Sequence, residues 1–196
     1  MQNRASCIRS ISRTSGSVQA VFAGGLTLVL FLVLFVTGCH AAEGSPMDLS
    51  STDLKDGKVP VAHTCDGSDV SPQLSWNAPP ADTRSLALIV TDPDAPSGTF
   101  THWVLFDLPP TERSLPQDVP QSDQLADGAR QGRNDFGRTG YGGPCPPHNS
   151  EHRYIFALYA LDTTLDLPAG ASRKQVEAAM RGHILSRGEL TARYRR

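Results

Sequence analysis

Three stretches of the chain have the hydrophobic pattern of β-strands. Residues 85–91 (SLALIVT) are almost uniformly apolar, which is typical of a strand buried on both faces. Residues 101–108 and 152–161 alternate between two faces with period two, which indicates strands with one face toward a core. Turn-forming residues bound each stretch, and residues 71–76 form a shorter candidate of the same kind. The pattern predicts a domain that is mostly β.

Polar aromatic side chains stand at the start of two of these strands. His152 and Tyr154 share one face of their strand, directly after a loop dense in glycine and proline at residues 142–147. In the strand at 101–108, the alternation places His102 on the same face as Val104. A strand start that follows a stiff loop is a place where the mouth of a pocket can form.

The loops differ in character. Residues 92–98 (DPDAPSG) combine two prolines with two aspartates, which predicts a rigid turn in which a cis peptide is one option. Residues 111–140 are polar with little periodicity, which predicts a long surface excursion with at most one short strand. A loop of this length in a compact domain is often functional.

The pattern changes to helical spacing toward the end of the chain. Residues 172–175 match a capping box, and apolar residues recur at helical spacing from Val176 to Ile184. Residues 186–189 are expected to cap a second short helix that reaches Tyr194. We therefore expect an all-β domain with C-terminal helices that cover one end of its sheets.

Residues 1–38 have the features of a secretory signal peptide. Three arginines and no acidic residue precede an uncharged stretch that contains LTLVLFLVLFV. That stretch ends at VTGC (residues 36–39), which resembles the bacterial lipoprotein box, so that Cys39 would carry the lipid. The alternative is an uncleaved membrane anchor, because the apolar stretch is just long enough to span a bilayer.

These features divide the chain into a signal peptide at 1–38, a lipid-anchored tether at 39–52 and a folded domain at 53–196. Both the lipoprotein and the uncleaved anchor hold the domain in the cell envelope, outside the cytoplasm. If the host has two membranes, His40 favours the outer membrane, with the domain facing the periplasm.

Composition and charge narrow the function. The chain has 196 residues, with 17 glycines and 15 prolines, which suits one globular domain of many short strands. After cleavage before Cys39 its formal charge would be −5, from 15 basic and 20 acidic residues. A mildly acidic domain offers no electrostatic case for binding nucleic acid.

Two cysteines remain for the folded domain, Cys65 and Cys145. In an oxidising compartment they are candidates for a disulfide that ties an early turn to the loop before His152. Two free buried thiols are the alternative, because the sequence does not give the Cα separation.

The ends of three predicted strands carry polar groups that could converge. Asp92 ends one strand, His102 begins another, and His152 and Tyr154 begin a third. Imidazole N–H groups, together with backbone N–H groups of the glycines at 142–143, would suit an anion, and Asp92 would orient an imidazole. The plainer interpretation is that each histidine is a satisfied structural residue.

Other chemistries fit this set less well. The spacing of Asp92, His102 and His152 matches no standard metal site, so we expect neither a metal nor a cofactor. No G-x-S-x-G, C-x-x-C or H-E-x-x-H motif is present, and Cys145 lies between two prolines, a poor setting for a nucleophile paired with His152. We therefore do not expect an enzyme, and we predict no catalytic residues.

Several motifs resemble the phosphatidylethanolamine-binding protein (PEBP) family, and most closely its bacterial, Raf-kinase-inhibitor-like branch. They are DPDAPSG (92–98), THWVLFDLP (101–109), GPCPPHNSEHRYIFALYALD (143–162), SPQLSW (71–76) and GHILSRGELTARY (182–194). The resemblance implies a β-sandwich of two antiparallel sheets. It also implies a small pocket for phosphate or a phospholipid headgroup, lined by Asp92, Pro96, His102, Gly143, Pro146, His152 and Tyr154.

One departure from the family pattern lies beside this pocket. Bacterial members usually have Lys-Gly after the double proline, whereas this chain has His148 and Asn149. The expected function is an extracytoplasmic, lipid-anchored module that binds a small anion. Two alternatives are a protein-interaction or inhibitor module that acts through residues 111–140, and a small-ester hydrolase that uses an Asp–His pair.

Overall fold

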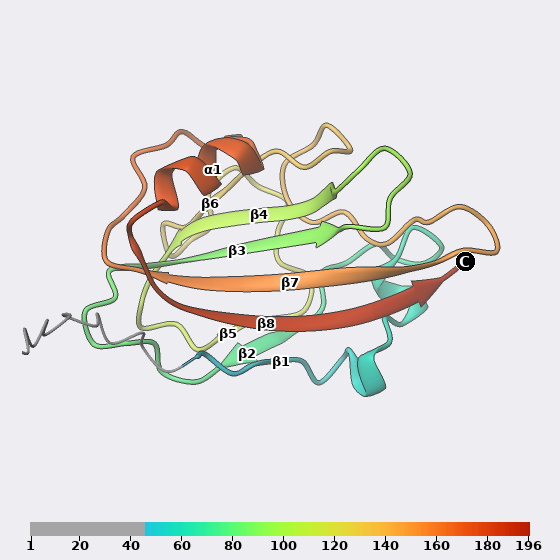
Figure 1. The fold of residues 1–196 in the computed structure, drawn as a ribbon, viewed down its shortest axis with the longest axis horizontal. Helices are drawn as coiled ribbons and strands as arrows, with labels where there is room; N and C mark the ends of the chain where they lie inside the picture. Colours follow the sequence, from blue (N-terminus) through green and yellow to red (C-terminus); the bar gives the residue numbers. More distant parts are fainter. Residues whose placement is uncertain (1–45) are drawn as a thin grey trace, which may run out of the picture. The chain divides into compact units, whose positions relative to one another are not determined.

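Two antiparallel β-sheets form the fold of this chain in a computed structural model that describes residues 46–196 (Figure 1). One sheet has the strand order β1-β2-β5 and the other the order β6-β4-β3-β7-β8. The strands are β1 (Leu49–Ser50), β2 (Leu74–Trp76), β3 (Ser85–Asp92), β4 (Phe100–Leu108), β5 (Ser114–Leu115), β6 (Arg130–Gln131), β7 (Glu151–Leu161) and β8 (Ile184–Arg195). The helices are α1 (Arg173–Met180) and the 3₁₀ turns η1 (Lys55–Gly57) and η2 (Val61–His63). The predicted fold class is confirmed.

The strand predicted to be buried on both faces lies in the middle of the larger sheet. One face of β3 carries Leu86, Leu88 and Val90, which pack in a core cluster between the two sheets. The other face carries Ala87 and Ile89, which belong to a second cluster under α1. Because both faces are covered, the apolar run has no polar alternation.

The helix prediction holds for α1 and fails beyond it. Ser172 and Gln175 exchange both capping-box bonds, and Val176 and Met180 face the second cluster. The second helix predicted from residues 186–189 to Tyr194 is wrong, because this segment is part of β8.

Strand β8 escaped the prediction because its most buried positions are small or polar. It pairs antiparallel with β7 from Glu151 to Leu161 and closes the larger sheet at one edge. Its buried positions are Ser186, Gly188 and Ala192, and the half-buried Leu190 and Tyr194 share their face, with exposed residues between them. This alternation has period two but weak hydrophobic contrast, so the capping signal at residues 186–189 favoured a helix instead.

The folded domain begins earlier than predicted. Met47 and Leu49 are buried in the cluster between the sheets, and Leu49 pairs with Trp76. Residues 47–50 therefore belong to the domain, and the predicted tether at 39–52 is too long at this end. Residues 1–45, which include the predicted signal peptide and Cys39, lie outside the described residues.

The predicted excursion at 111–140 is fastened to both sheets. Strand β5 extends the smaller sheet and β6 extends the larger one, where the sequence indicated at most one strand. The indole of Trp103 donates to the Gln131 side chain at 2.7 Å, and that side chain donates to the backbone of residues 120 and 122. Within residues 46–196 there is no cis peptide bond, so that option for the turn at 92–98 is excluded, and no helix is long and apolar enough to cross a membrane.

Candidate functional site

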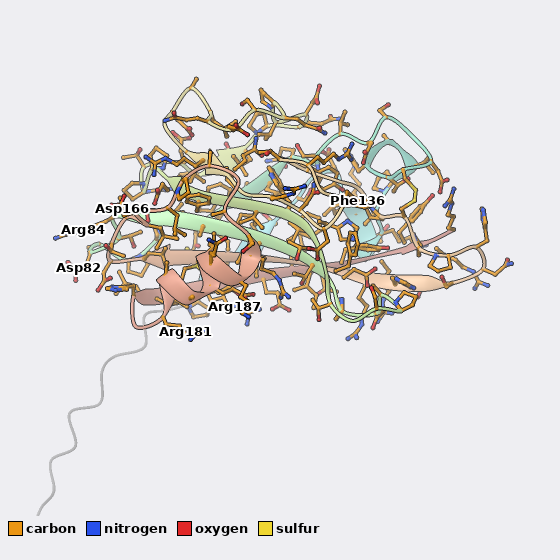
Figure 2. All side chains as sticks on the ribbon, turned by 90° about the horizontal axis from the view of Figure 1, so that it is seen from above. Asp82, Arg84, Phe136, Asp166, Arg181 and Arg187 are labelled. Carbon is orange, nitrogen blue, oxygen red and sulfur yellow. A yellow bond between two sulfur atoms is a disulfide. The ribbon has the colours of Figure 1, made fainter. Side chains whose placement is uncertain are left out.

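A pocket of about 410 Å³ lies where β3 ends and where β4 and β7 begin. In Figure 2, Phe136, one of its lining residues, lies right of centre, well away from Arg84, which precedes β3 at the left. Three strands, the β3–β4 and β6–β7 connections and the residue after β8 supply its wall: Asp92, Ala95, Pro96, Ser97, Phe100, His102, Phe136, Cys145, Pro146, Pro147, His152 and Arg196. The antiparallel order brings together the strand ends that the sequence pattern singled out.

Asp92 and His152 form a buried pair on neighbouring strands. The imidazole Nδ1 lies 2.7 Å from Asp92 Oδ2, and both side chains are at most 8% exposed. The other carboxylate oxygen accepts the backbone N–H of Asp94 at 2.8 Å. Because a carboxylate accepts hydrogen bonds, Nδ1 donates and Nε2 remains for the pocket. A protonated His152 can donate from Nε2 while Asp92 balances its charge.

The turn at 92–98 is clamped to the start of β7 by a second acidic residue. Asp94 receives the Arg153 guanidinium through both of its oxygens, at 2.6 and 2.8 Å, and also the Arg153 backbone N–H at 3.0 Å. This guanidinium holds the pKa of Asp94 well below its usual range. Asp94 therefore positions the loop, whereas Asp92 faces the pocket.

His102 reaches the pocket because of a β-bulge. Val90 pairs with Trp103 and Thr91 pairs with Thr101, which leaves His102 as an extra residue in β4. The imidazole packs edge-on against the Tyr154 ring with their centroids 5.1 Å apart. The predicted alternation, which placed His102 on the Val104 face, is therefore wrong at this position, since Val104 lies in the cluster under α1.

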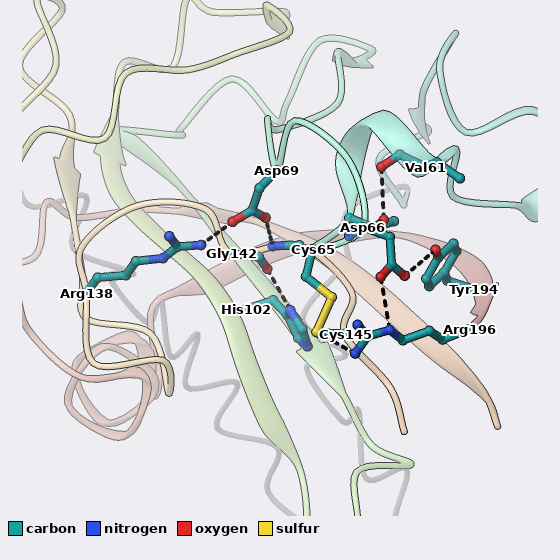
Figure 3. The surroundings of a disulfide bond; sticks show 12 residues. Val61, Cys65, Asp66, Asp69, His102, Arg138, Gly142, Cys145, Tyr194 and Arg196 are labelled. Atoms are coloured by element: carbon teal, nitrogen blue, oxygen red, sulfur yellow. Dashed lines mark hydrogen bonds and ion pairs between the residues drawn. A yellow bond between two sulfur atoms is a disulfide. The ribbon is translucent and has the colours of Figure 1, made fainter. Parts of the chain in front are cut away.

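The hydrogen bond of His102 fixes its tautomer. Nδ1 lies 2.6 Å from the carbonyl oxygen of Gly142, which only accepts, so Nδ1 carries the hydrogen (Figure 3). Burial lowers the pKa of His102 below 6.5, against the opposing influence of the Gly142 carbonyl and the Asp92 carboxylate. A neutral imidazole with its hydrogen on Nδ1 has a lone pair at Nε2.

Tyr154 lies behind the two histidines and is almost fully buried. Its hydroxyl lies within reach of the Asp92 carboxylate, although outside the strict geometry of a hydrogen bond, and Tyr154 is not among the residues that line the pocket. Burial and the negative charge of Asp92 raise the pKa of Tyr154. The hydroxyl therefore keeps its hydrogen, for which the Asp92 carboxylate is the nearby acceptor.

The glycine N–H groups do not point to the anion as the sequence suggested. Gly142 donates its N–H to the His102 carbonyl at 3.0 Å, and Gly143 donates to Asp69 at 2.6 Å. Asp69 also pairs with Arg138. A Cβ on Gly143 would lie 2.4 Å from the His63 carbonyl oxygen, so glycine is required there for close packing. The predicted role of Gly143 as an anion donor is wrong, and it does not line the pocket.

The remaining predicted residues come together at the pocket mouth. Pro96 and Pro146 line the pocket from two different loops. Cys65 and Cys145 are joined by a disulfide with their Cα atoms 5.4 Å apart (Figure 3). Cys145 itself lines the pocket, and among residues 46–196 its backbone N–H has no hydrogen-bond partner. His148 is exposed and lies outside the lining.

Phe100, Phe136 and Arg196 are among the lining residues that were not predicted. Phe100 and Phe136 stack edge-on with centroids 4.8 Å apart, and both pack against His102. Arg196 follows β8, and its Nε lies 3.0 Å from Asp66 Oδ1, next to the disulfide (Figure 3). Phe100 stands two residues before His102, but no local signal in the sequence connects Phe136 or Arg196 with the strand ends.

Comparison with known proteins identifies relatives of this chain. The sequence model of the phosphatidylethanolamine-binding protein family matches residues 50–195. The chain is 51% identical over 151 residues to a UPF0098 protein of Methanothermobacter thermautotrophicus, covering 76% of this chain and 99% of that protein. It is 41% identical over 157 residues to UPF0098 protein YbhB of Escherichia coli, covering 76% and 99%. The crystal structure of E. coli YbcL, described as a member of the mammalian PEBP family, superposes with a TM-score of 0.72 at 33% identity, covering 78% of this chain and 99% of that one.

Proposed function

Because the chain belongs to the phosphatidylethanolamine-binding protein family, in its bacterial YbhB and YbcL type, we propose that it is a binding module whose pocket holds a small phosphate-like anion. The ligand is either free phosphate or the phosphate of a phospholipid headgroup. The observation that carries this proposal is the buried pair of Asp92 and His152, whose free Nε2 is left for the pocket.

The donors around the pocket favour an oxyanion. A protonated His152, the guanidinium of Arg196 and the backbone N–H of Cys145, which has no partner among residues 46–196, can each donate to an oxygen atom. Asp92 keeps the imidazolium charge balanced, which lowers the cost of holding a cation in a buried place. A volume of about 410 Å³ suits a small ligand.

We place this module outside the cytoplasm, held to a membrane by a lipid on Cys39. The disulfide between Cys65 and Cys145 supports an oxidising compartment. Labelling cells with a radioactive fatty acid tests the anchor: the chain should take up label, and a Cys39→Ala variant should not. Equal labelling of both would contradict the lipid anchor.

Calorimetry on the full chain tests the binding function, with inorganic phosphate and phosphoethanolamine as ligands. The wild-type chain should bind at least one of them, and His152→Ala should lose most of that affinity. His148→Ala is the matched control, since this histidine is exposed and outside the lining, and it should bind like the wild type. Absence of binding by the wild-type chain would contradict the proposal.

The pair of Asp92 and His152 also has the geometry of a general base, which keeps a hydrolase as a second candidate. A hydrolase should turn over a small ester such as 4-nitrophenyl acetate, with a rate that His152→Ala abolishes. If the protein is only a binding module, the wild-type chain should bind phosphate and should hydrolyse the ester no faster than the His152→Ala variant does.

A further inference from the structure

The two histidines of the pocket differ in what they can offer a ligand. We propose that His102 makes the pocket selective for oxyanions that still carry a hydrogen, namely inorganic phosphate and phosphomonoesters, over sulfate and phosphodiesters. The inference rests on the proposed function and deepens it, because it names the class of anion.

The carbonyl oxygen of Gly142 sets the tautomer of His102. It lies 2.6 Å from His102 Nδ1 and can only accept, so it determines which ring nitrogen holds the hydrogen. A neutral imidazole has one N–H, and Nε2 is then an acceptor. His102 lines the pocket, so this lone pair is the feature that it offers to a ligand.

The surroundings of His102 oppose a second proton on the ring. Phe100, Phe136 and Tyr154 surround the imidazole with ring centroids 5.1 to 5.4 Å away, and the side chain is 2% exposed. Asp92 and Asp135 are the carboxylates near enough to favour the charged form, and burial outweighs them. Asp92 is already held by His152, and Asp135 accepts the Thr101 N–H at 2.6 Å.

The pocket therefore contains acceptors as well as donors. His102 Nε2 and the Asp92 carboxylate are acceptors, while His152 in its protonated form and Arg196 are donors. An anion without a hydrogen would place its own lone pairs against that of His102. An anion with a P–OH group can donate to Nε2 and accept from the other groups at the same time.

This requirement separates ligands of similar size and charge. Inorganic phosphate near neutral pH carries at least one P–OH group, and a phosphomonoester carries one in its monoanionic form. Sulfate and phosphodiesters, including the headgroup linkage of a membrane phospholipid, carry none. A buried acceptor left without a donor weakens binding, and we expect a preference for phosphate of at least about tenfold.

Calorimetry on the full chain at pH 6 tests the preference with four ligands: phosphate, sulfate, phosphoethanolamine as the monoester and glycerophosphoethanolamine as the diester. Phosphate and the monoester should bind at least about tenfold more tightly than sulfate and the diester. Equal affinity for all four would overturn the inference and leave the anion-binding function standing. Binding of none would overturn both.

A variant and a spectroscopic measurement assign the preference to His102. His102→Phe keeps an aromatic ring but removes the acceptor, so phosphate and sulfate should bind with similar affinity; a preserved preference would contradict the role of His102. If this variant does not fold, ¹⁵N NMR of the wild-type imidazoles decides. Nε2 of His102 should remain unprotonated in the phosphate complex, and an imidazolium signal there would overturn the inference.

Discussion

His102 and His152 lie at the starts of the two strands that flank β3, and they differ in the group that accepts the hydrogen bond from Nδ1. His152 donates to a carboxylate, so a proton added at its Nε2 is compensated by Asp92. His102 donates to the carbonyl of Gly142 inside an aromatic cluster, and burial lowers its pKa. The same side chain serves as a potential cation in one place and as a neutral acceptor in the other.

The difference shows how a second layer of residues sets the chemistry of a pocket. Asp92 belongs to the strand between the two histidines and is turned to His152. Gly142 belongs to the loop that the disulfide at Cys145 fastens to the η2 region. One histidine is therefore positioned by the sheet, whereas the other depends on a loop.

Of these changes, removing the disulfide should lower the stability of the fold most. It should also disturb the surroundings of His102 more than those of His152. Replacing Cys65 and Cys145 with serine should lower the free energy of unfolding by about 4 kcal/mol, because the bond closes a long loop in the unfolded chain. The contact between His102 and Gly142 should loosen, whereas Asp92 and His152 remain paired between strands. Urea denaturation and imidazole NMR would measure the two effects.

Dithiothreitol provides the control for this change. It should shift the wild-type chain toward the stability of the double serine variant and leave that variant unaffected. A wild-type chain as stable with reductant as without it, at full reduction, would contradict the account.

A rescue experiment separates the two histidines further. His152→Ala should destabilise the fold by about 3 kcal/mol, because it leaves the Asp92 carboxylate buried and unpaired. Adding Asp92→Asn should recover part of that loss. The same second change should not rescue His102→Ala, whose unpaired group is a carbonyl. Thermal and urea unfolding of the single and double variants test this, and an equal rescue of both would erase the distinction.

The stability of the protein should also depend on pH through His102. The unfolded chain takes up a proton on this residue below about pH 6.5, whereas burial keeps the folded side chain neutral to lower pH. The folded state is therefore favoured above this pH and loses stability as the pH falls, by up to about 1.4 kcal/mol per pH unit.

The measurement is the difference in unfolding free energy between the wild-type chain and His102→Phe from pH 7.5 to 5. Groups common to both chains cancel, so the wild-type chain should lose more stability as the pH falls. Parallel curves would show that His102 titrates alike in the folded and unfolded states.

The smallest expected change is in phosphate affinity when the positive charge of Arg196 is removed. Arg196 follows β8, the neighbour of β7, and lines the pocket. Arg196→Gln should weaken phosphate binding by about fivefold, which corresponds to a partly exposed ion pair. Arg195→Gln removes the same charge outside the lining and should change the affinity little. Equal losses would indicate a general effect of net charge.

Much of this arrangement could be predicted from local patterns. The apolar run of β3 and the alternation of β7 gave the centre of the larger sheet, and antiparallel pairing then brought Asp92 beside His152. The capping box that starts α1 could likewise be predicted, because its signal lies within four consecutive residues.

The features that escaped depend on contacts distant in sequence. The bulge that turns His102 toward Tyr154 arises from the pairing between β3 and β4, and the hydrophobic pattern of β4 alone does not reveal it. Gly143 gives its N–H to Asp69, and a glycine-rich loop alone does not show which acceptor will lie opposite. Strand β8 has small residues at its most buried positions, and at Gly188 the close approach of the Met47 backbone leaves no room for a side chain.

Neutron diffraction from deuterium-exchanged crystals of the phosphate complex would test the division between the two histidines most directly, because it locates hydrogen atoms. The account predicts deuterium on Nδ1 of both rings and on Nε2 of His152. It also predicts that the phosphate oxygen facing His102 carries deuterium, with none on His102 Nε2. Deuterium on His102 Nε2, opposite a bare phosphate oxygen, would contradict the account.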